Sequence, residues 1–191
     1  RPVKVYNFRY AVGPRGADHL RVSCPGGYAL DQLPILEAAE RLRYWQGVVA
    51  VPDLMGLCKF AYTYYTENPD IALHRTLEIV PEMYTAATGF GLTKEQLLEA
   101  SVRVTNVERA HNCRLGLTAA DDTLPPRFTE DPIPAGPSKG KVYDILEPMK
   151  EAWYTAQGWN TETGIPKQET LDKLGLADIA RDLRQHGIEV T

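Results

Sequence analysis

The chain has 191 residues, of which 43% are hydrophobic and 24% are charged, proportions typical of a soluble globular protein. Its net charge of −4 argues against a domain that binds nucleic-acid phosphates, because such domains are usually basic. No apolar run approaches the ~18 residues of a membrane-spanning helix, and no apolar stretch of a signal peptide follows the first residues. The three cysteines lie far apart, so we expect no disulfide scaffold and a cytoplasmic location.

The first thirty residues predict irregular structure. The chain starts with Arg1 and runs directly into an apolar stretch, from which we expect a fragment of a longer protein. Residues 3–12 alternate in part between apolar and polar types, which favours a short strand or an extended segment. Two breaks rich in glycine and proline, at 13–16 and 25–27, enclose a loop that carries His19 and Arg21. Such loops often carry functional side chains, and they are also common as ordinary surface loops.

Helical periodicity starts at Pro34. Residues 34–50 place apolar side chains on one face, which predicts an amphipathic helix. Asp53 is in a position to cap a second helix, which would end near residues 67–70. A short helix is predicted over residues 81–89, ending at glycine.

A long helix is predicted to begin after Thr93. Thr93 and Gln96 have the spacing of a capping box, and the helix would continue to about Leu117 with Val104 and Val107 on its buried side. Further helical patterns cover residues 144–157, 168–174 and 178–187. Gly158, Gly175 and Gly187 lie at the ends of these segments, where C-caps are expected.

Residues 118–141 contain five prolines and are predicted to form a long ordered loop. Near its start, Asp121 and Asp122 are expected to anchor the loop through Arg127 or backbone amides. Strand patterns are few, so the predicted fold class is mainly α. We expect two parts, a helical segment over residues 1–66 and a helical region over residues 67–191 that includes the loop.

The sharpest local motif is Asp53-x-x-Gly56-Leu57-Cys58. An ionised carboxylate only accepts hydrogen bonds, so Asp53 could receive N–H groups from a ligand. Gly56 would let another group approach the backbone, and a Cys58 thiolate would suit an iron–sulfur cluster. Spacing alone leaves a second interpretation open, in which the three residues are a capping Asp, a packing Gly and a buried Cys.

The motif resembles the second pterin-binding motif of the aldehyde ferredoxin oxidoreductases, a family of tungsten enzymes. The segment 15–21 is similar to the Arg-Gly-x-x-His segment of that family. Segments 107–127 and 159–176 are similar to its C-terminal signature. The resemblance therefore spans nearly the whole chain and implies the multihelical C-terminal domains of that family.

The resemblance also implies the functional residues. Asp53 would hydrogen-bond a pterin of a bis-pterin tungsten cofactor (tungstopterin), with Gly56 and Leu57 beside it, and Cys58 would be the last ligand of a 4Fe–4S cluster. His19 would transfer a proton during catalysis, the alternative being a solvent-exposed loop histidine. Arg21 would meet pterin phosphates, with a surface role as the alternative.

The implied activity of a full-length parent is oxidation of small aldehydes to carboxylic acids, with electrons passing to ferredoxin. The chain lacks the Cys-x-x-Cys-x-x-x-Cys motif of the family, so we expect it to depend on a missing N-terminal domain. Alone it is expected to hold no cofactor and to be inactive, and it could form a homo-oligomer. The alternative function is a non-catalytic helical domain for interaction or assembly.

Overall fold

A computed structural model describes residues 4–18, 20–21, 30–59 and 69–191, and this part of the chain is helical. The helices are α1 (Lys4–Ala11), α3 (Ile35–Leu54), α5 (Pro69–Thr88), α6 (Lys94–Arg114), α7 (Pro126–Thr129), α8 (Leu146–Gln157), α9 (Gln168–Lys173) and α10 (Ala177–Gln185). The mainly α fold class is therefore confirmed. None of the described helices is long and apolar enough to cross a membrane.

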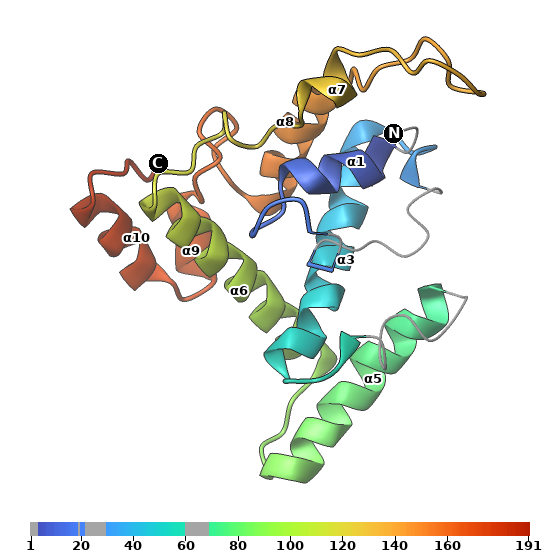
Figure 1. The fold of residues 1–191 in the computed structure, drawn as a ribbon. Coiled ribbons are helices and arrows are strands. Elements are labelled where there is room, and N and C mark those ends of the chain that lie inside the picture. Colours follow the sequence, from blue (N-terminus) through green and yellow to red (C-terminus); the bar gives the residue numbers. More distant parts are fainter. Residues whose placement is uncertain (1–3, 19, 22–29, 60–68) are drawn as a thin grey trace.

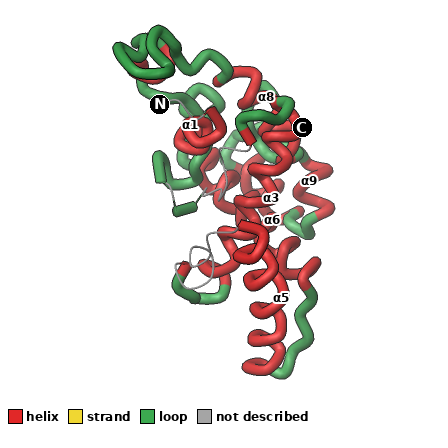
Figure 2. Tube along the Cα trace, turned by 90° about the vertical axis from the view of Figure 1, so that its right-hand side faces the viewer, coloured by secondary structure: helices red, strands yellow, loops and turns green. Residues whose placement is uncertain are grey.

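Two long helices, α3 and α6, organise the molecule. Helix α3 packs against α8, α6 and α5, whereas α6 also contacts α5 and α10. Figures 1 and 2 show α5 at one end of the molecule, with α1 and α8 toward the other end. Helices α9 and α10 pack on each other beside α6 (Figure 1).

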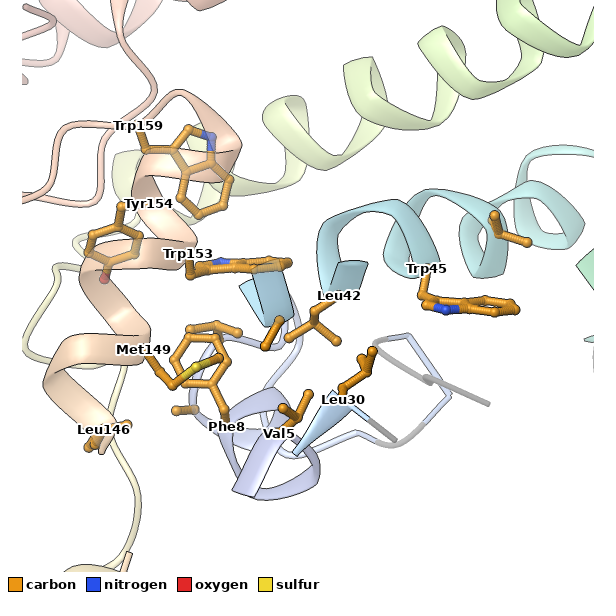
Figure 3. Close-up of a cluster of buried hydrophobic side chains, with 14 of the residues drawn as sticks. Val5, Phe8, Leu30, Leu42, Trp45, Leu146, Met149, Trp153, Tyr154 and Trp159 are labelled. Atoms are coloured by element: carbon orange, nitrogen blue, oxygen red, sulfur yellow. The ribbon is translucent and has the colours of Figure 1, made fainter. Parts of the chain in front are cut away.

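The main hydrophobic core lies where α1, α3 and α8 meet (Figure 3). The rings of Phe8 and Trp153, both fully buried, meet edge to face with centroids 6.0 Å apart, a favoured aromatic geometry. Leu42 from α3 and Met149 from α8 fill the space beside them. A smaller core joins Ala110 of α6 to the two C-terminal helices.

Several local predictions are confirmed. Helix α3 contains almost all of the predicted segment 34–50. Helix α6 begins with the predicted capping box, in which Gln96 N donates to Thr93 Oγ1 and Thr93 N donates to Gln96 Oε1. Glycine at the C-cap of α8 has a left-handed φ of 72°, as expected for a helix end.

The predicted strand or extended segment over residues 3–12 is wrong, because α1 is a helix. Its buried residues Val5, Phe8 and Ala11 are spaced three apart and form one helical face. The partial alternation in the sequence therefore did not reflect a sheet.

The helix predicted over residues 81–89 is also corrected, since α5 begins twelve residues earlier at Pro69. Proline fits the first turn of a helix, and Pro69 takes that place. Pro81 lies inside α5, where the buried residues Leu77 and Val80 hold the helix in the core despite the lost backbone hydrogen bond.

The predicted buried side of α6 is only partly right. Val107 is 38% exposed, whereas the polar residues Thr105, Asn106 and Arg109 are buried. Each of the three makes hydrogen bonds inside the protein; for example, Asn106 Oδ1 accepts from Trp159 Nε1 at 2.9 Å. A hydrophobic pattern does not detect a polar network of this kind.

The segment 118–141 contains the four-residue helix α7, with Pro126 in its first turn. Asp121 anchors the start of this segment, because its Oδ2 accepts from the Thr118 backbone N at 2.7 Å. Asp122 was expected to pair with Arg127 or a backbone amide. The structure instead pairs it with Arg109, with 2.8 Å between Arg109 Nη2 and Asp122 Oδ2. The proposed division at residue 66 remains a prediction.

Candidate functional site

The residues of the Asp53-x-x-Gly56-Leu57-Cys58 motif, here called the Asp53–Cys58 turn, end helix α3. Asp53 lies in the last helical turn, which corrects the prediction that it caps the start of a second helix. Gly56 N donates to Asp53 O, and Leu57 N donates to Pro52 O at 2.8 Å. These bonds, with a left-handed φ of 65° at Gly56, make a Schellman motif.

The Schellman motif explains the spacing of the sequence motif. Glycine is favoured at position 56 because the backbone is left-handed there. Leu57 follows as the apolar residue that packs back on the main core. Cys58 comes directly after it and is exposed. The turn therefore presents Asp53 and Cys58 at the surface from a rigid helix end.

Two cations converge on one oxygen of Asp53. Lys59 Nζ lies 2.8 Å from Asp53 Oδ2, and Arg21 Nη1 contacts the same oxygen. The side chains of Lys59 and Arg21 are only 9% and 11% exposed, whereas that of Asp53 is 37% exposed. Among the described residues, none donates a hydrogen bond to the second oxygen, Oδ1.

The two cations also stabilise the charge of Asp53. Partial burial alone would raise the pKa of Asp53, but hydrogen bonds and charges from Lys59 and Arg21 outweigh burial and lower it. This compensation matters because a helix C-terminus carries a partial negative charge, which is unfavourable for a carboxylate. Asp53 is therefore held ionised at neutral pH.

The site is tied to two further parts of the chain. Lys59 Nζ donates to the backbone O of Leu20 at 2.8 Å, which joins the Asp53–Cys58 turn to the segment that carries Arg21. Arg21 Nη2 also contacts Glu108 on α6. Arg21 thus lies between two carboxylates.

Cys58 can contribute one ligand to a metal cluster. Within the described ranges, no group of three or more His, Cys, Asp and Glu side chains could hold a metal ion. An iron–sulfur cluster normally needs four ligands, so the described residues fit such a group as the donor of one thiolate beside an ionised carboxylate. The exposure of Cys58 and of Asp53 is consistent with that partial role.

The structure brings together Asp53, Gly56, Leu57, Cys58 and Arg21, all of which the sequence nominated. His19 lies outside the described residues. Sequence reasoning missed the contributions of Lys59 and Glu108. Lys59 directly follows Cys58, so its position was a usable signal, whereas Glu108 acts through a contact across 87 residues that no local spacing reveals.

A comparison with protein families finds that residues 1–176 match the family described as "Aldehyde ferredoxin oxidoreductase, domains 2 & 3". The tungsten-containing aldehyde ferredoxin oxidoreductase of Pyrococcus furiosus is 32% identical over 186 residues, which cover 93% of this chain and 29% of that protein. The enzyme of the same name from Thermococcus kodakarensis is 31% identical with the same coverage. The chain thus spans less than a third of the length of these relatives.

Two further similarities are more distant or partial. The aliphatic sulfonate oxidoreductase WOR-like subunit of Pyrococcus furiosus is 36% identical over 117 residues, 56% of this chain. A solved structure, the active site complex BamBC of benzoyl coenzyme A reductase with 1,5 dienoyl-CoA, has a TM-score of 0.72 over 98% of this chain and 32% of its own. At 19% identity this second similarity concerns the fold alone.

Proposed function

The chain belongs to the aldehyde ferredoxin oxidoreductase family, and from this membership we propose that it forms one wall of a tungstopterin and iron–sulfur site. The proposed reaction is oxidation of a small aldehyde to a carboxylic acid. The aldehyde gains one oxygen atom from water and loses two electrons and two protons overall, and ferredoxin accepts the electrons. The groups absent from these 191 residues would come from another domain.

One observation carries the proposal, namely the unequal use of the two oxygens of Asp53. Oδ2 holds Arg21 and Lys59, while no described residue donates to Oδ1, on a side chain that is 37% exposed. We propose that Oδ1 accepts an N–H group of a pterin.

The other residues of the turn have roles that follow from their positions. Gly56 lets the cofactor approach the backbone because it has no Cβ, and Leu57 anchors the turn to the core. Cys58 would bind a 4Fe–4S cluster through its thiolate. When bound, the tungsten cofactor supplies the two-electron chemistry and the cluster conducts electrons away.

Arg21 enters the proposal mainly as a partner of Asp53. Each terminal nitrogen of its guanidinium contacts a carboxylate, Nη1 that of Asp53 and Nη2 that of Glu108. A contact with a pterin phosphate would therefore have to use the remaining N–H groups of Arg21. His19 is proposed to transfer a proton at the substrate. Replacing it with alanine should keep the metals but lower turnover by roughly a hundredfold or more.

Metal analysis of the full-length holoprotein tests the proposal. Wild type should contain tungsten and about four irons per chain. Cys58→Ser should lower iron and abolish electron transfer to ferredoxin, and Asp53→Asn should weaken retention of the pterin. Cys113→Ala, a change at a buried thiol away from the turn, is the control and should keep both metals.

The result that would contradict the proposal is equally direct. A colourless full-length protein without iron or tungsten, after anaerobic expression with both metals supplied, would favour the alternative of a non-catalytic assembly domain. Full iron content in Cys58→Ser would remove Cys58 from the ligand set.

A further inference from the structure

Arg21 is held from two directions by acidic groups that are remote in sequence. Its Nη1 contacts Asp53, 32 residues later in the chain, and its Nη2 contacts Glu108, 87 residues later. The Arg21 side chain is 11% exposed, so its guanidinium has little access to water. Glu108 and Asp53 are 33% and 37% exposed. The charged cluster therefore has its cations inside and its carboxylates at the rim.

The two cations on Asp53 differ in how they are anchored. Lys59 follows Asp53 by six positions, and it is also bound to the backbone O of Leu20 at 2.8 Å. Arg21 has a long side chain with several rotatable bonds, and a guanidinium is most rigid when both of its edges are engaged. Glu108 supplies the second edge from α6, a long helix that packs directly on α3.

We propose that Glu108 is a positioning residue for the cofactor site: it holds one edge of the Arg21 guanidinium so that the other edge stays in contact with Asp53 Oδ2 and holds that carboxylate in place. The role in cofactor binding rests on the proposed function. The positioning itself is a property of this chain and can be tested without any cofactor. In this proposal Glu108 acts through Arg21, which it contacts, and not directly on Asp53.

Two interpretations of Glu108, as a positioning residue or as a nearby negative charge, predict opposite changes in the pKa of Asp53 when Glu108 is removed. If Glu108 were only a nearby negative charge, removing it would relieve repulsion and lower the pKa of Asp53. If Glu108 positions Arg21, removing it loosens the Arg21 contact and raises the pKa of Asp53. The groups that face Asp53 in the described ranges are Arg21 and Lys59, with Glu108 behind Arg21.

The experiment is a carbon-13 NMR titration of the Asp53 carboxyl group in the full chain, with the signal assigned by Asp53→Asn. We expect Glu108→Ala to raise the pKa of Asp53 by about half a unit or more. Glu108→Gln keeps an acceptor for Arg21 Nη2, so it should not raise that pKa. Glu99→Ala, at an exposed position on the same helix, is the control and should change nothing.

The proposal is overturned if the pKa of Asp53 in Glu108→Ala is the same as in wild type or lower, and does not differ from that in Glu108→Gln. Should Glu108→Ala be too unstable to titrate, Glu108→Ser removes the same contact and carries the same expectation. The proposed function fails separately, if Asp53→Asn holoprotein keeps its full tungsten content. The positioning result can then still stand, because it is measured on the protein without cofactor.

Discussion

Arg109 and Asp122 form a buried, two-pronged ion pair between α6 and the segment that follows it. Arg109 Nη1 lies 3.0 Å from Asp122 Oδ1, and Arg109 Nη2 lies 2.8 Å from Asp122 Oδ2. Arg109 Nε also donates to the backbone O of Gly164 at 2.8 Å, and the Tyr154 hydroxyl donates to Asp122. One guanidinium thus joins three segments of the chain.

Two aromatic rings, those of Tyr154 and Trp159, also contact the Arg109 guanidinium. The guanidinium carbon lies 5.6 Å from the ring centroid of Tyr154 and 5.0 Å from that of Trp159, within range of a cation–π interaction. Burial alone would lower the pKa of Arg109, but the hydrogen bond and charge of Asp122 outweigh it and raise the pKa. For Tyr154, burial is the main cause of a raised pKa, and Asp122 adds to it.

Removing one partner of this pair should be strongly destabilising. Arg109→Met keeps much of the side-chain volume but leaves the Asp122 carboxylate buried without its cation. We expect a loss of about 3 to 5 kcal/mol in the free energy of unfolding, measured by urea denaturation. The matched control is Arg114→Met on the same helix, where the partner Asp182 is exposed and the pair is worth about 0 to 1 kcal/mol. Equal losses in the two variants would contradict a special role for the buried pair.

Gly164 should be less tolerant of a side chain than Gly175. Both have a left-handed backbone, with φ of 69° and 67°, so alanine costs about 1 to 2 kcal/mol at either position. An added Cβ at Gly164 would also collide with Arg109 and lie 2.9 Å from Tyr154 Cζ, whereas at Gly175 it meets no described atom within 4 Å. We expect Gly164→Ala to be about 1 to 3 kcal/mol more destabilising than Gly175→Ala in thermal or urea unfolding. A similar loss at both positions would show that the collision is relieved.

The described thiols should differ in reactivity. Cys58 is exposed, whereas Cys113 is buried and burial is the main cause that raises its pKa. In a Cys24→Ser background without cofactor, an aromatic disulfide reagent should modify Cys58 rapidly. Cys113 should react roughly a hundredfold or more slowly, because it must wait for local unfolding. Cys58→Ser should remove the fast phase, and a fast phase that persists would contradict the exposure of Cys58.

The Asp53 ion pairs should make stability depend on pH in the acid range. The pKa of Asp53 is lowered below 3.8 in the folded chain, so its contribution is present above the unfolded-state pKa and is lost as pH falls through the folded-state pKa. The difference in unfolding free energy between wild type and Asp53→Asn should therefore be largest above about pH 5 and shrink below about pH 4. Chemical denaturation at several pH values measures it, with Glu99→Gln as control. A difference that grows on acidification would show that the pKa is raised instead.

The amino-acid sequence by itself determined the local features of this protein. The Thr93 capping box, the helical segment α3 and the glycine that ends α8 were all predictable, because each depends on residues within one or two helical turns. The single apolar face expected of α3 was only partly right, since Leu36 is 51% exposed and residues 45–52 are all buried. The family was likewise recognisable from ordered short motifs. The Asp53–Cys58 turn was also identified as a candidate site from the sequence. Asp53 was expected at the start of a helix, however, and it lies in the last turn of α3.

Only the tertiary structure decided how the charged residues are paired. The sequence did not predict that Arg109 pairs with Asp122 or packs against the aromatic rings around it. It also did not predict the contact between Glu108 and Arg21. Spacing within a helix reports which residues share a face, but it does not report which distant segment covers that face. The partners of a buried cation are therefore set by chain packing. A charge in the low-dielectric interior is stable only when an opposite charge and hydrogen bonds offset the cost of removing it from water.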